Sequence, residues 1–189
     1  PFKASSCGRE VDGNEVRLQA RNTETFRNMS TPTEAGQLSQ FLMGINWMRD
    51  GLPCFTDTDP VDPDSSFAAV SKPLWDLLQQ VYDMVKSRKK ARYEHIRLAD
   101  VGWGEPHARS FQQLPAQLST DLARAPPVPS ATWCLFSAAS DDFYAAMLTQ
   151  VVVWDDALPA HEQKHIPLGT LSGEFKGSQK NWSIIEKEA

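Results

Sequence analysis

The stretch Trp133-Cys134-Leu135-Phe136-Ser137-Ala138-Ala139-Ser140 determines what we expect of the second half of the chain. Its first four residues form an apolar run that is long enough for a buried β-strand. Small residues follow, and Asp141-Asp142 then provide a turn signal. A second apolar run, residues 143–153, predicts a partner strand that returns beside the first.

Three segments complete this pattern: Leu148-Thr149-Gln150, His165-Ile166-Pro167-Leu168 and Trp182 through Ala189. In this order and spacing they resemble the start of the RNase H domain of gypsy-type LTR-retrotransposon Pol polyproteins. That family has Thr-Asp-Ala-Ser at the end of its first strand, an apolar strand closing on Gln, a His/Pro-apolar strand, and Tyr or Trp before Glu-Lys-Glu-Ala. The resemblance implies three antiparallel strands that lead into a helix.

The N-terminal segment predicts a hairpin and two helices. In residues 7–20, Asp12-Gly13-Asn14 is the turn signal, flanked by the apolar positions Val11, Val16 and Leu18. Residues 21–29 favour a short helix that ends before Pro32. A second helix is expected to start at Thr31-Pro32, where Thr31 can cap it and Pro32 suits its first turn. Its apolar stripe comprises Leu38, Phe41, Leu42, Ile45 and Met48.

This N-terminal block resembles the end of the thumb region of gypsy-type reverse transcriptases. The family has a Gly-containing hairpin, a helix, a Pro, then Leu-x-x-Phe-Leu-Gly, an aromatic-Arg pair and Pro-x-Phe. Residues 38–44, residues 47–49 and Pro53-Cys54-Phe55 follow that order. The resemblance implies contact with the backbone of a template–primer duplex, for which Arg49 and Arg21 are the expected phosphate ligands. The apolar positions are expected to pack in a core.

The middle of the chain combines a loop with a basic helix end. Residues 56–66, rich in Asp and Pro, predict a linker or surface loop. Apolar residues then recur at helical spacing and form one stripe: Trp75, Leu78, Val81, Tyr82 and Val85. A basic run follows the stripe: Lys86, Arg88, Lys89, Lys90 and Arg92. The basic run can track a nucleic-acid backbone. It can equally be a solvated helix end whose cations suit the helix dipole.

The segment that precedes the RNase H-like strands differs from the family's pattern at one position. Residues 96–103 predict a short strand, and residues 105–122 predict a helix with Phe111, Leu114 and Leu118 on one face. Ala125-Pro126-Pro127 fits the family's exit into the first RNase H strand. Pro115 stands where the family usually has Lys, and a proline within a helix costs about 3 kcal/mol and kinks it.

Composition narrows the possible protein classes. The chain has 189 residues with 41% hydrophobic content, which suits one or two small globular domains. Its net charge of −5 argues against a strongly basic module. Cys7, Cys54 and Cys134 form neither a disulfide ladder nor a zinc motif, which favours a reducing compartment. No apolar run reaches the ~20 residues of a membrane span and no leader is evident, so we expect an intracellular protein, cytoplasmic or nuclear and not secreted.

The resemblance also implies a metal site, and this sequence lacks its first ligand. In the family, two magnesium ions are held by carboxylates and activate the water that hydrolyses the RNA strand of a hybrid. The first carboxylate position is Ala138 here, whereas the second, Glu188, is present. Two more acidic ligands would fall beyond Ala189. Asp141 and Asp142 are better explained as turn residues. We therefore expect no magnesium pair and no hydrolysis, with positions 138 and 188 facing each other at the emptied site.

A different metal site is suggested by His161-Glu162-Gln163-Lys164-His165, which matches the zinc-hydrolase pattern of two His four residues apart. On a helix the two imidazoles would share one face, and Glu162 could act as a general base. Pro159 and Pro167 leave room for barely two helical turns, and the segment falls between two expected strands. These features count against the zinc site.

Three further residues are expected to meet nucleic acid. Trp182 could stack on a base or sugar, although an aromatic there more often fills the seam between sheet and helix. Ser140 and Gln150 could contact the backbone of a hybrid.

Together these patterns predict an α+β fold and a three-part chain. Residues 1–56 would be the end of a thumb-like region, residues 57–104 a connection, and residues 105–189 the N-terminal part of an RNase H-like domain. The parent activity implied is RNA-directed DNA synthesis with RNA–DNA hybrid hydrolysis. The alternatives are a domesticated, non-catalytic module that binds nucleic acid or protein, and a zinc hydrolase.

Overall fold

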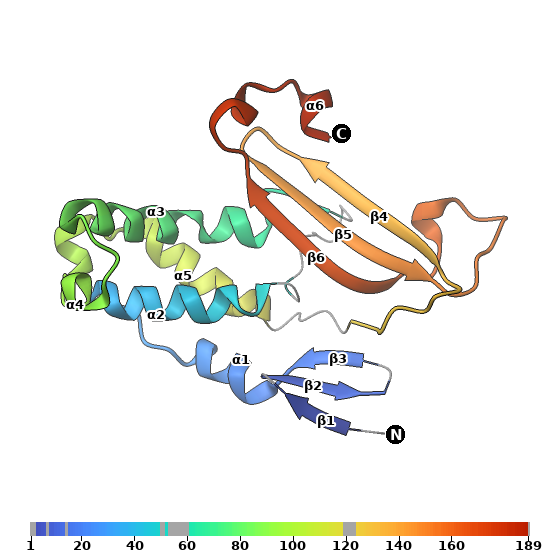
Figure 1. Ribbon diagram of the computed structural model, residues 1–189, viewed down its shortest axis with the longest axis horizontal. Coiled ribbons are helices and arrows are strands. Elements are labelled where there is room, and N and C mark those ends of the chain that lie inside the picture. Colours follow the sequence, from blue (N-terminus) through green and yellow to red (C-terminus); the bar gives the residue numbers. More distant parts are fainter. Residues whose placement is uncertain are drawn as a thin grey trace.

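The computed structural model describes residues 3–6, 8–13, 15–49, 52, 61–118 and 124–188. Its helices and two antiparallel sheets form an α+β fold, which confirms the predicted class (Figure 1). In chain order the elements are β1 (Lys3–Ser6), β2 (Arg9–Asp12), β3 (Glu15–Leu18), α1 (Ala20–Arg27), α2 (Ala35–Asn46), α3 (Phe67–Val85), α4 (Lys90–Tyr93), η2 (Leu98–Val101), α5 (Glu105–Gln117), β4 (Thr132–Ala139), β5 (Phe143–Val151), η4 (Ala160–Glu162), β6 (Ile166–Glu174), η5 (Gly177–Asn181) and α6 (Ile184–Glu188).

The N-terminal sheet contains the predicted hairpin and one strand more. β2 and β3 pair antiparallel with Val11 opposite Val16, as the apolar spacing predicts. β1 pairs with the other edge of β2 and was not expected from the sequence. Asn14 of the turn and Cys7 lie outside the described residues.

The main core lies among α2, α3 and α5, which run side by side in Figure 1. Leu38, Phe41, Leu42 and Ile45 of α2 are fully buried, and the ring of Phe41 lies 4.6 Å from that of Phe111 on α5. The predicted start of α2 is wrong. The helix begins at Ala35, because Glu34 and Gln37 form a capping box in which each satisfies a backbone N–H of the other.

Residues 61–66 form a loop, as predicted, but part of it is buried instead of lying on the surface, and residues 56–60 lie outside the described part. Val61 is buried against Ala145 of β5. Ser66 is fully buried and caps α3 by accepting a hydrogen bond from the N–H of Ala69. The aspartates of this segment stay near solvent, so composition alone suggested a loop where the backbone is packed.

Two predictions for the segment after α3 need correction. Residues 96–103 form the short helix η2 and a single bridge between Glu34 and Arg97 instead of a strand. Gly102, with a φ of 96°, ends η2 in a left-handed conformation that prevents an extended strand. α5 ends at Gln117, and residues 119–123 lie outside the described part. Pro115 lies in the last turn of α5, and the helix ends two residues after it, at Gln117.

The C-terminal sheet has the predicted order β4-β5-β6, antiparallel throughout. Leu135 lies opposite Leu148, and Asp141-Asp142 form the turn between β4 and β5. One face of this sheet packs toward α3, where the N–H of Ala68 donates to Ser172 Oγ at 3.2 Å. The other face is exposed over much of its area, with exposed fractions of 56% for Trp133, 67% for Leu135 and 55% for Leu171, although Gln150 on this face is buried. The prediction of a buried first strand is therefore wrong: the outer face of β4 is exposed, and Cys134, Phe136 and Ala138 on the inner face are half-buried.

No helix within the described residues is both long and apolar enough to cross a membrane.

The packing of α2 gives a first prediction. Phe41→Ala should lower the free energy of unfolding by about 3–5 kcal/mol, because it leaves a cavity at the centre of the helical core. Met43 lies on the same helix but is exposed, so Met43→Ala should change stability by about 0.5 kcal/mol or less. Urea denaturation of both variants measures the difference. Equal losses for the two variants would contradict this placement of the core.

Candidate nucleic-acid interface

The basic run lies at the end of the helical part that is distant from the C-terminal sheet. α3 ends at Val85, and the following Lys86 adopts a left-handed conformation with a φ of 50° that turns the chain away from the helix axis. The N–H of Ser87 bonds to the carbonyl of Tyr82, and Lys89 precedes the single turn of α4. All five cations of the run are exposed: Lys86, Arg88, Lys89, Lys90 and Arg92.

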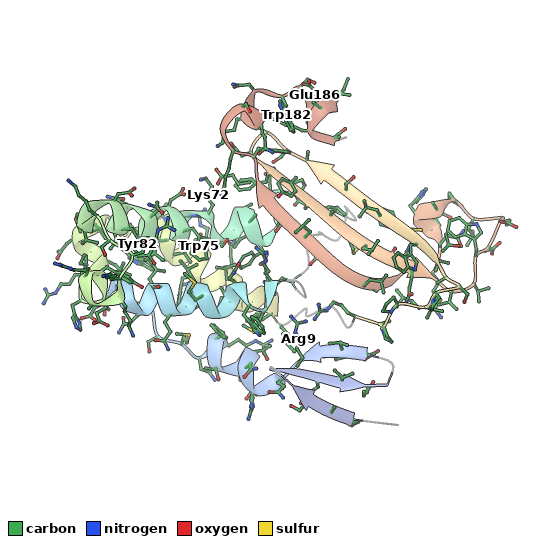
Figure 2. All side chains as sticks on the ribbon, in the orientation of Figure 1. Arg9, Lys72, Trp75, Tyr82, Trp182 and Glu186 are labelled. Atoms are coloured by element: carbon green, nitrogen blue, oxygen red, sulfur yellow. The ribbon has the colours of Figure 1, made fainter. Side chains whose placement is uncertain are left out.

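Arg88 is the cation of this run whose side chain contacts α3. Its Nη2 donates to Gln79 Oε1 at 3.0 Å, and its guanidinium lies 5.6 Å from the centroid of the Tyr82 ring. Partial burial raises the pKa of Tyr82, so the ring stays neutral beneath the cation. Gln79 is itself held, because its Nε2 donates to Asp83 Oδ1 at 2.8 Å. The loop is thus folded back onto α3, with Tyr82 at the far end of that helix (Figure 2).

Arg49 and Arg21, the other cations expected to contact phosphate, do not lie beside the basic run. Arg49 is exposed just beyond the C-terminal end of α2, whereas α4 packs near the start of that helix. A helix of 12 residues is roughly 18 Å long, so Arg49 and the basic run lie well apart. Arg21 is exposed and donates from Nε to Gln19 Oε1 at 3.1 Å. The motif Pro53-Cys54-Phe55 lies outside the described residues.

The residues expected at the RNase H-like metal site do not fit a magnesium pair. Ala138 offers no oxygen, and it packs on the inner face of the sheet beside Ala145 and Val61. Glu188 is exposed on α6, which lies by the end of β4, where Lys187 Nζ donates to the carbonyl of Asp141 at 2.9 Å. Within the described residues no three His, Cys, Asp or Glu side chains gather closely enough to hold a metal ion.

The zinc-hydrolase alternative fails on local geometry. His161 and Glu162 belong to η4, a single short turn, and His165 lies beyond its end. The ring of His165 is already engaged at both nitrogens: Nδ1 is 2.8 Å from Thr149 Oγ1 and Nε2 is 2.6 Å from the carbonyl of Ala160. The two imidazoles therefore do not share a helical face.

Gln150 is a structural residue, which corrects its expected contact with nucleic acid. Its side chain is 1% exposed. Its Oε1 accepts from the N–H of Val128 at 2.8 Å, and its Nε2 donates to the carbonyl of Pro126 at 3.0 Å. The amide therefore ties the segment before β4 to the sheet.

Ser140 and Trp182 have different surroundings. Ser140 Oγ donates to Asp64 Oδ1 at 2.8 Å and accepts from the N–H of Phe143, so it supports the β4–β5 turn. Trp182 does not fill the sheet–helix seam. It is 42% exposed after η5, near α6 in Figure 2.

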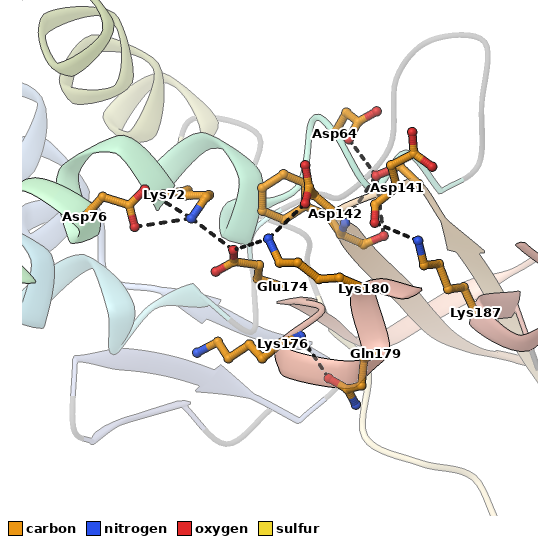
Figure 3. Close-up of polar contacts among 12 residues, drawn as sticks. Asp64, Lys72, Asp76, Asp141, Asp142, Glu174, Lys176, Gln179, Lys180 and Lys187 are labelled. Carbon is orange, nitrogen blue, oxygen red and sulfur yellow. Dashed lines mark hydrogen bonds and ion pairs between the residues drawn. The ribbon is translucent and has the colours of Figure 1, made fainter. Parts of the chain in front are cut away.

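An ionic junction that the sequence did not reveal fixes the sheet to the helical part (Figure 3). Glu174 at the end of β6 bonds Lys72 of α3 at 2.9 Å and Lys180 of η5 at 3.3 Å. Lys72 also pairs with Asp76, and Lys180 pairs with Asp142 of the β4–β5 turn at 3.0 Å. We call these five residues the α3–β6 junction. Lys72 and Glu174 are about a hundred positions apart in the sequence, so no local pattern could have paired them.

Within the α3–β6 junction, hydrogen bonds shift the pKa of four charged groups toward the ionised form. Burial alone would raise the pKa of Glu174, but its hydrogen bonds to Lys72 and Lys180 outweigh burial and hold that pKa below its ordinary value. The hydrogen bond from Lys180 likewise lowers the pKa of Asp142. Glu174 in turn raises the pKa of Lys72, and Asp142 raises that of Lys180. The junction is therefore fully ionised near neutral pH.

Comparisons with known proteins identify the fold. No protein-family pattern matches the sequence, and no curated protein matches it significantly. Among solved structures, the foamy viral protease-reverse transcriptase in complex with dsDNA matches with a TM-score of 0.66 and 14% identity over 99% of this chain. The same protein in complex with RNA/DNA hybrid matches with a TM-score of 0.67 and 14% identity, again over 99%. The dRH form in complex with dsDNA matches with a TM-score of 0.67 and 13% identity over 100%.

These matches cover 31%, 20% and 26% of the longer chains respectively. This chain thus spans less than a third of the proteins it resembles. At such low identity the matches establish the fold alone, which resembles a portion of a reverse transcriptase.

The α3–β6 junction gives a second prediction. Glu174→Gln should lower the free energy of unfolding at neutral pH by about 1 kcal/mol or less, since the pairs are partly exposed. The folded-state pKa of Glu174 is depressed, so its contribution is present above the unfolded-state pKa and is lost as pH falls through the folded-state value. The difference from the unmodified chain should therefore shrink in acid, below the ordinary carboxyl value of 4.5.

Urea denaturation across a pH series measures this difference. Glu105→Gln is the matched control, because it removes an exposed pair with Arg109 on α5 and leaves the junction intact. A difference between Glu174→Gln and the unmodified chain that grew in acid would contradict the assigned charges.

Proposed function

We propose that this chain is a nucleic-acid-binding portion of a gypsy-type retrotransposon reverse transcriptase/RNase H polyprotein that no longer hydrolyses RNA. The observation that carries the proposal is the fold, which matches the protease-reverse transcriptases bound to duplex nucleic acid over essentially the whole chain. The motif order from the hairpin at residues 9–18 to Trp182 supports the gypsy-type assignment.

The exposed basic run is the best candidate for contact with a duplex. Its five cations lie within seven positions, and the nearest acidic partner, Glu94, is 3.8 Å from Lys90. Phosphate contacts of this kind give affinity without sequence preference. The chain as a whole is acidic, so binding must come from local charge and should depend strongly on salt.

Arg88 is the cation that is most prepared to bind. Its contacts with Gln79 and Tyr82 restrict the side chain in the free protein, so less conformational entropy is lost when a phosphate binds. The guanidinium can still donate from its remaining N–H groups, because it has five donors in total. Lys86 and Lys89 flank it from the loop without a competing acidic partner in the described residues.

Loss of hydrolysis follows from the residues at the expected metal site. Two magnesium ions need several oxygen ligands, and the first expected position is a methyl group at Ala138. Glu188 alone cannot replace the set. The proposed role is therefore binding of RNA–DNA hybrid or template–primer duplex without hydrolysis of the RNA.

The third prediction tests binding. A variant with four cations of the run replaced should bind a labelled RNA–DNA hybrid at least tenfold more weakly, because phosphate contacts are lost: Arg88→Ala, Lys89→Ala, Lys90→Ala, Arg92→Ala. For duplexes the slope of log K against log salt falls by roughly 0.9 for each phosphate contact removed. Fluorescence anisotropy over a salt series measures both quantities.

The control variant has the same net charge as the test variant, but its four replaced cations lie outside the basic run. It carries four exposed cations replaced outside the run: Arg27→Ala, Arg109→Ala, Lys164→Ala and Lys176→Ala. This variant should keep most of the affinity. Equal loss in both variants would show that binding reflects overall charge alone, and absence of binding by the unmodified chain would remove the proposed function.

The fourth prediction concerns hydrolysis. The purified chain should not cleave the RNA strand of a hybrid in the presence of magnesium. Ala138→Asp should not restore cleavage, because one further carboxylate beside Glu188 leaves the ligand set incomplete. A gel assay with labelled RNA measures this, and magnesium-dependent cleavage that disappears in Glu188→Ala would overturn the assignment.

A further inference from the structure

The loop between α3 and α4 carries a serine inside the basic run. Ser87 follows Lys86 directly and is followed by Arg88 and Lys89. Residues 87–89 belong to no helix or strand, and Ser87 is half-buried. Its Oγ accepts a hydrogen bond from the N–H of Lys89 at 3.2 Å, and within the described residues it donates none. The fold of the loop therefore does not depend on the hydroxyl proton of Ser87.

A hollow of about 410 Å³ lies beside this serine, between the loop and the end of α3. Its wall contains the two cations that flank Ser87 in the sequence, Lys86 and Arg88, and one acidic residue, Asp83, whose Oδ1 accepts from Gln79 Nε2 at 2.8 Å. Cations thus outnumber carboxylates around the hollow, which therefore suits an anion. The residues that line it are Gln79, Tyr82, Asp83, Lys86, Ser87 and Arg88.

The charge of the loop keeps it in contact with water or with anions. Five cations lie within residues 86–92, and burying such charges without anionic partners is costly. A protein surface placed over this loop would have to supply acidic groups. The position of Ser87 near the surface therefore follows from the local charge.

Phosphorylation is the modification that this serine suits. In the transfer, Ser87 Oγ forms a bond to the γ-phosphorus of ATP, and the bond from that phosphorus to the bridging oxygen breaks. ADP leaves with the electron pair of the broken bond, and the hydroxyl proton passes to a base of the kinase. Because basic residues flank Ser87 on both sides, the kinase must present an acidic substrate groove.

A phosphoryl group on Ser87 changes the charge of the basic run. It adds a charge of about −1.5 to −2 at neutral pH, together with three acceptor oxygens. This charge offsets about two of the five cations. Guanidinium and ammonium groups form charge-assisted hydrogen bonds with phosphate oxygens, so Arg88 and Lys86 can bind the phosphoryl group within the chain. The cations that contact a duplex are then occupied, and the remaining negative charge repels the duplex.

We propose that Ser87 is a phosphorylation site for an ATP-dependent protein kinase that selects serines among basic residues, and that its phosphorylation releases the chain from duplex nucleic acid. The release rests on the proposed function. The phosphorylation itself does not, because it requires only the loop and its charges.

The first experiment tests the site without nucleic acid. The full chain is incubated with the catalytic domain of protein kinase C, ATP and magnesium, and tandem mass spectrometry should locate the phosphoryl group at Ser87. Ser130 provides the comparison, because it is exposed in the turn before β4 and has no Lys or Arg within five positions. Ser130 should stay unmodified, and Ser87→Ala should lose most of the incorporation. No phosphorylation of Ser87, or equal phosphorylation of Ser130, would overturn the site.

The second experiment tests the release. Genetically encoded Ser87→phosphoserine should bind a labelled RNA–DNA hybrid about tenfold more weakly than the unmodified chain, and the slope of log K against log salt should fall by roughly 1.8 when two phosphate contacts are lost. Fluorescence anisotropy over a salt series measures both. Ser130→phosphoserine has the same net charge and lies far from α4 in Figure 1, so it should keep most of the affinity.

The outcomes of these experiments separate the two proposals. Equal affinity of the two phosphoserine chains would overturn the release and leave the proposed function standing. Absence of binding by the unmodified chain would remove the proposed function and the release with it, whereas the mass spectrometry would still decide whether Ser87 is a phosphorylation site.

A phosphorus NMR titration tests where the phosphoryl group lies. The second pKa of phosphoserine is about 6, and neighbouring cations lower it because they stabilise the dianion. The pKa of the phosphoserine at position 87 should therefore lie below that of the phosphoserine at position 130. Arg88→Ala should reduce the difference. Equal pKa values at the two positions would contradict the contact with Lys86 and Arg88.

Discussion

The contact between α3 and β6 determines how the two halves of this molecule are arranged. α3 packs its apolar stripe into the helical core, yet on another side it binds the sheet through Lys72 and Glu174. The same contact includes the hydrogen bond between Ala68 and Ser172. Because α3 also carries Tyr82 and the basic run at its far end, this single helix links the position of the sheet to the position of the proposed phosphate contacts.

Ala138 stands where the resembled family has the first carboxylate, and the fold does not require that carboxylate. The inner face of β4 carries a small apolar residue at this point, which packs beside Ala145 and Val61. Alanine meets that requirement, and a carboxylate there would need a cation or solvent to offset its burial. The sheet can therefore keep its register, turn and packing without the oxygen that a metal would need. Resemblance in fold and order of motifs consequently says little about hydrolysis, whereas one side chain excludes the expected ligand set.

The sequence predicted what depends on local periodicity and missed what depends on distant partners. The stripe from Leu38 to Ile45, the hairpin pairing Val11 with Val16 and the turn at Asp141-Asp142 all follow from spacing within a few residues. The role of Gln150 could not be predicted in this way, since its partners at Pro126 and Val128 are defined only once the chain has folded back. The α3–β6 junction and the exposed face of β4 could not be predicted from the sequence for the same reason. The domain boundaries stay predictions, and so do the contacts of the basic run, Arg49 and Trp182 with nucleic acid.

The two halves also differ in how they are held together. The helical part has a large buried core, whereas the apolar cluster at the sheet comprises only Val61 and Ala145, with Phe136, Ala138 and Met147 partly covered. Val151 and Phe175 are also buried at the sheet. A sheet is stable when its apolar faces are covered by another layer, and here Trp133, Leu135 and Leu171 on one face stay largely exposed. Polar contacts such as those of Glu174 fix geometry but contribute little net free energy at a partly exposed site. The sheet is therefore positioned by the α3–β6 junction more than it is stabilised by it.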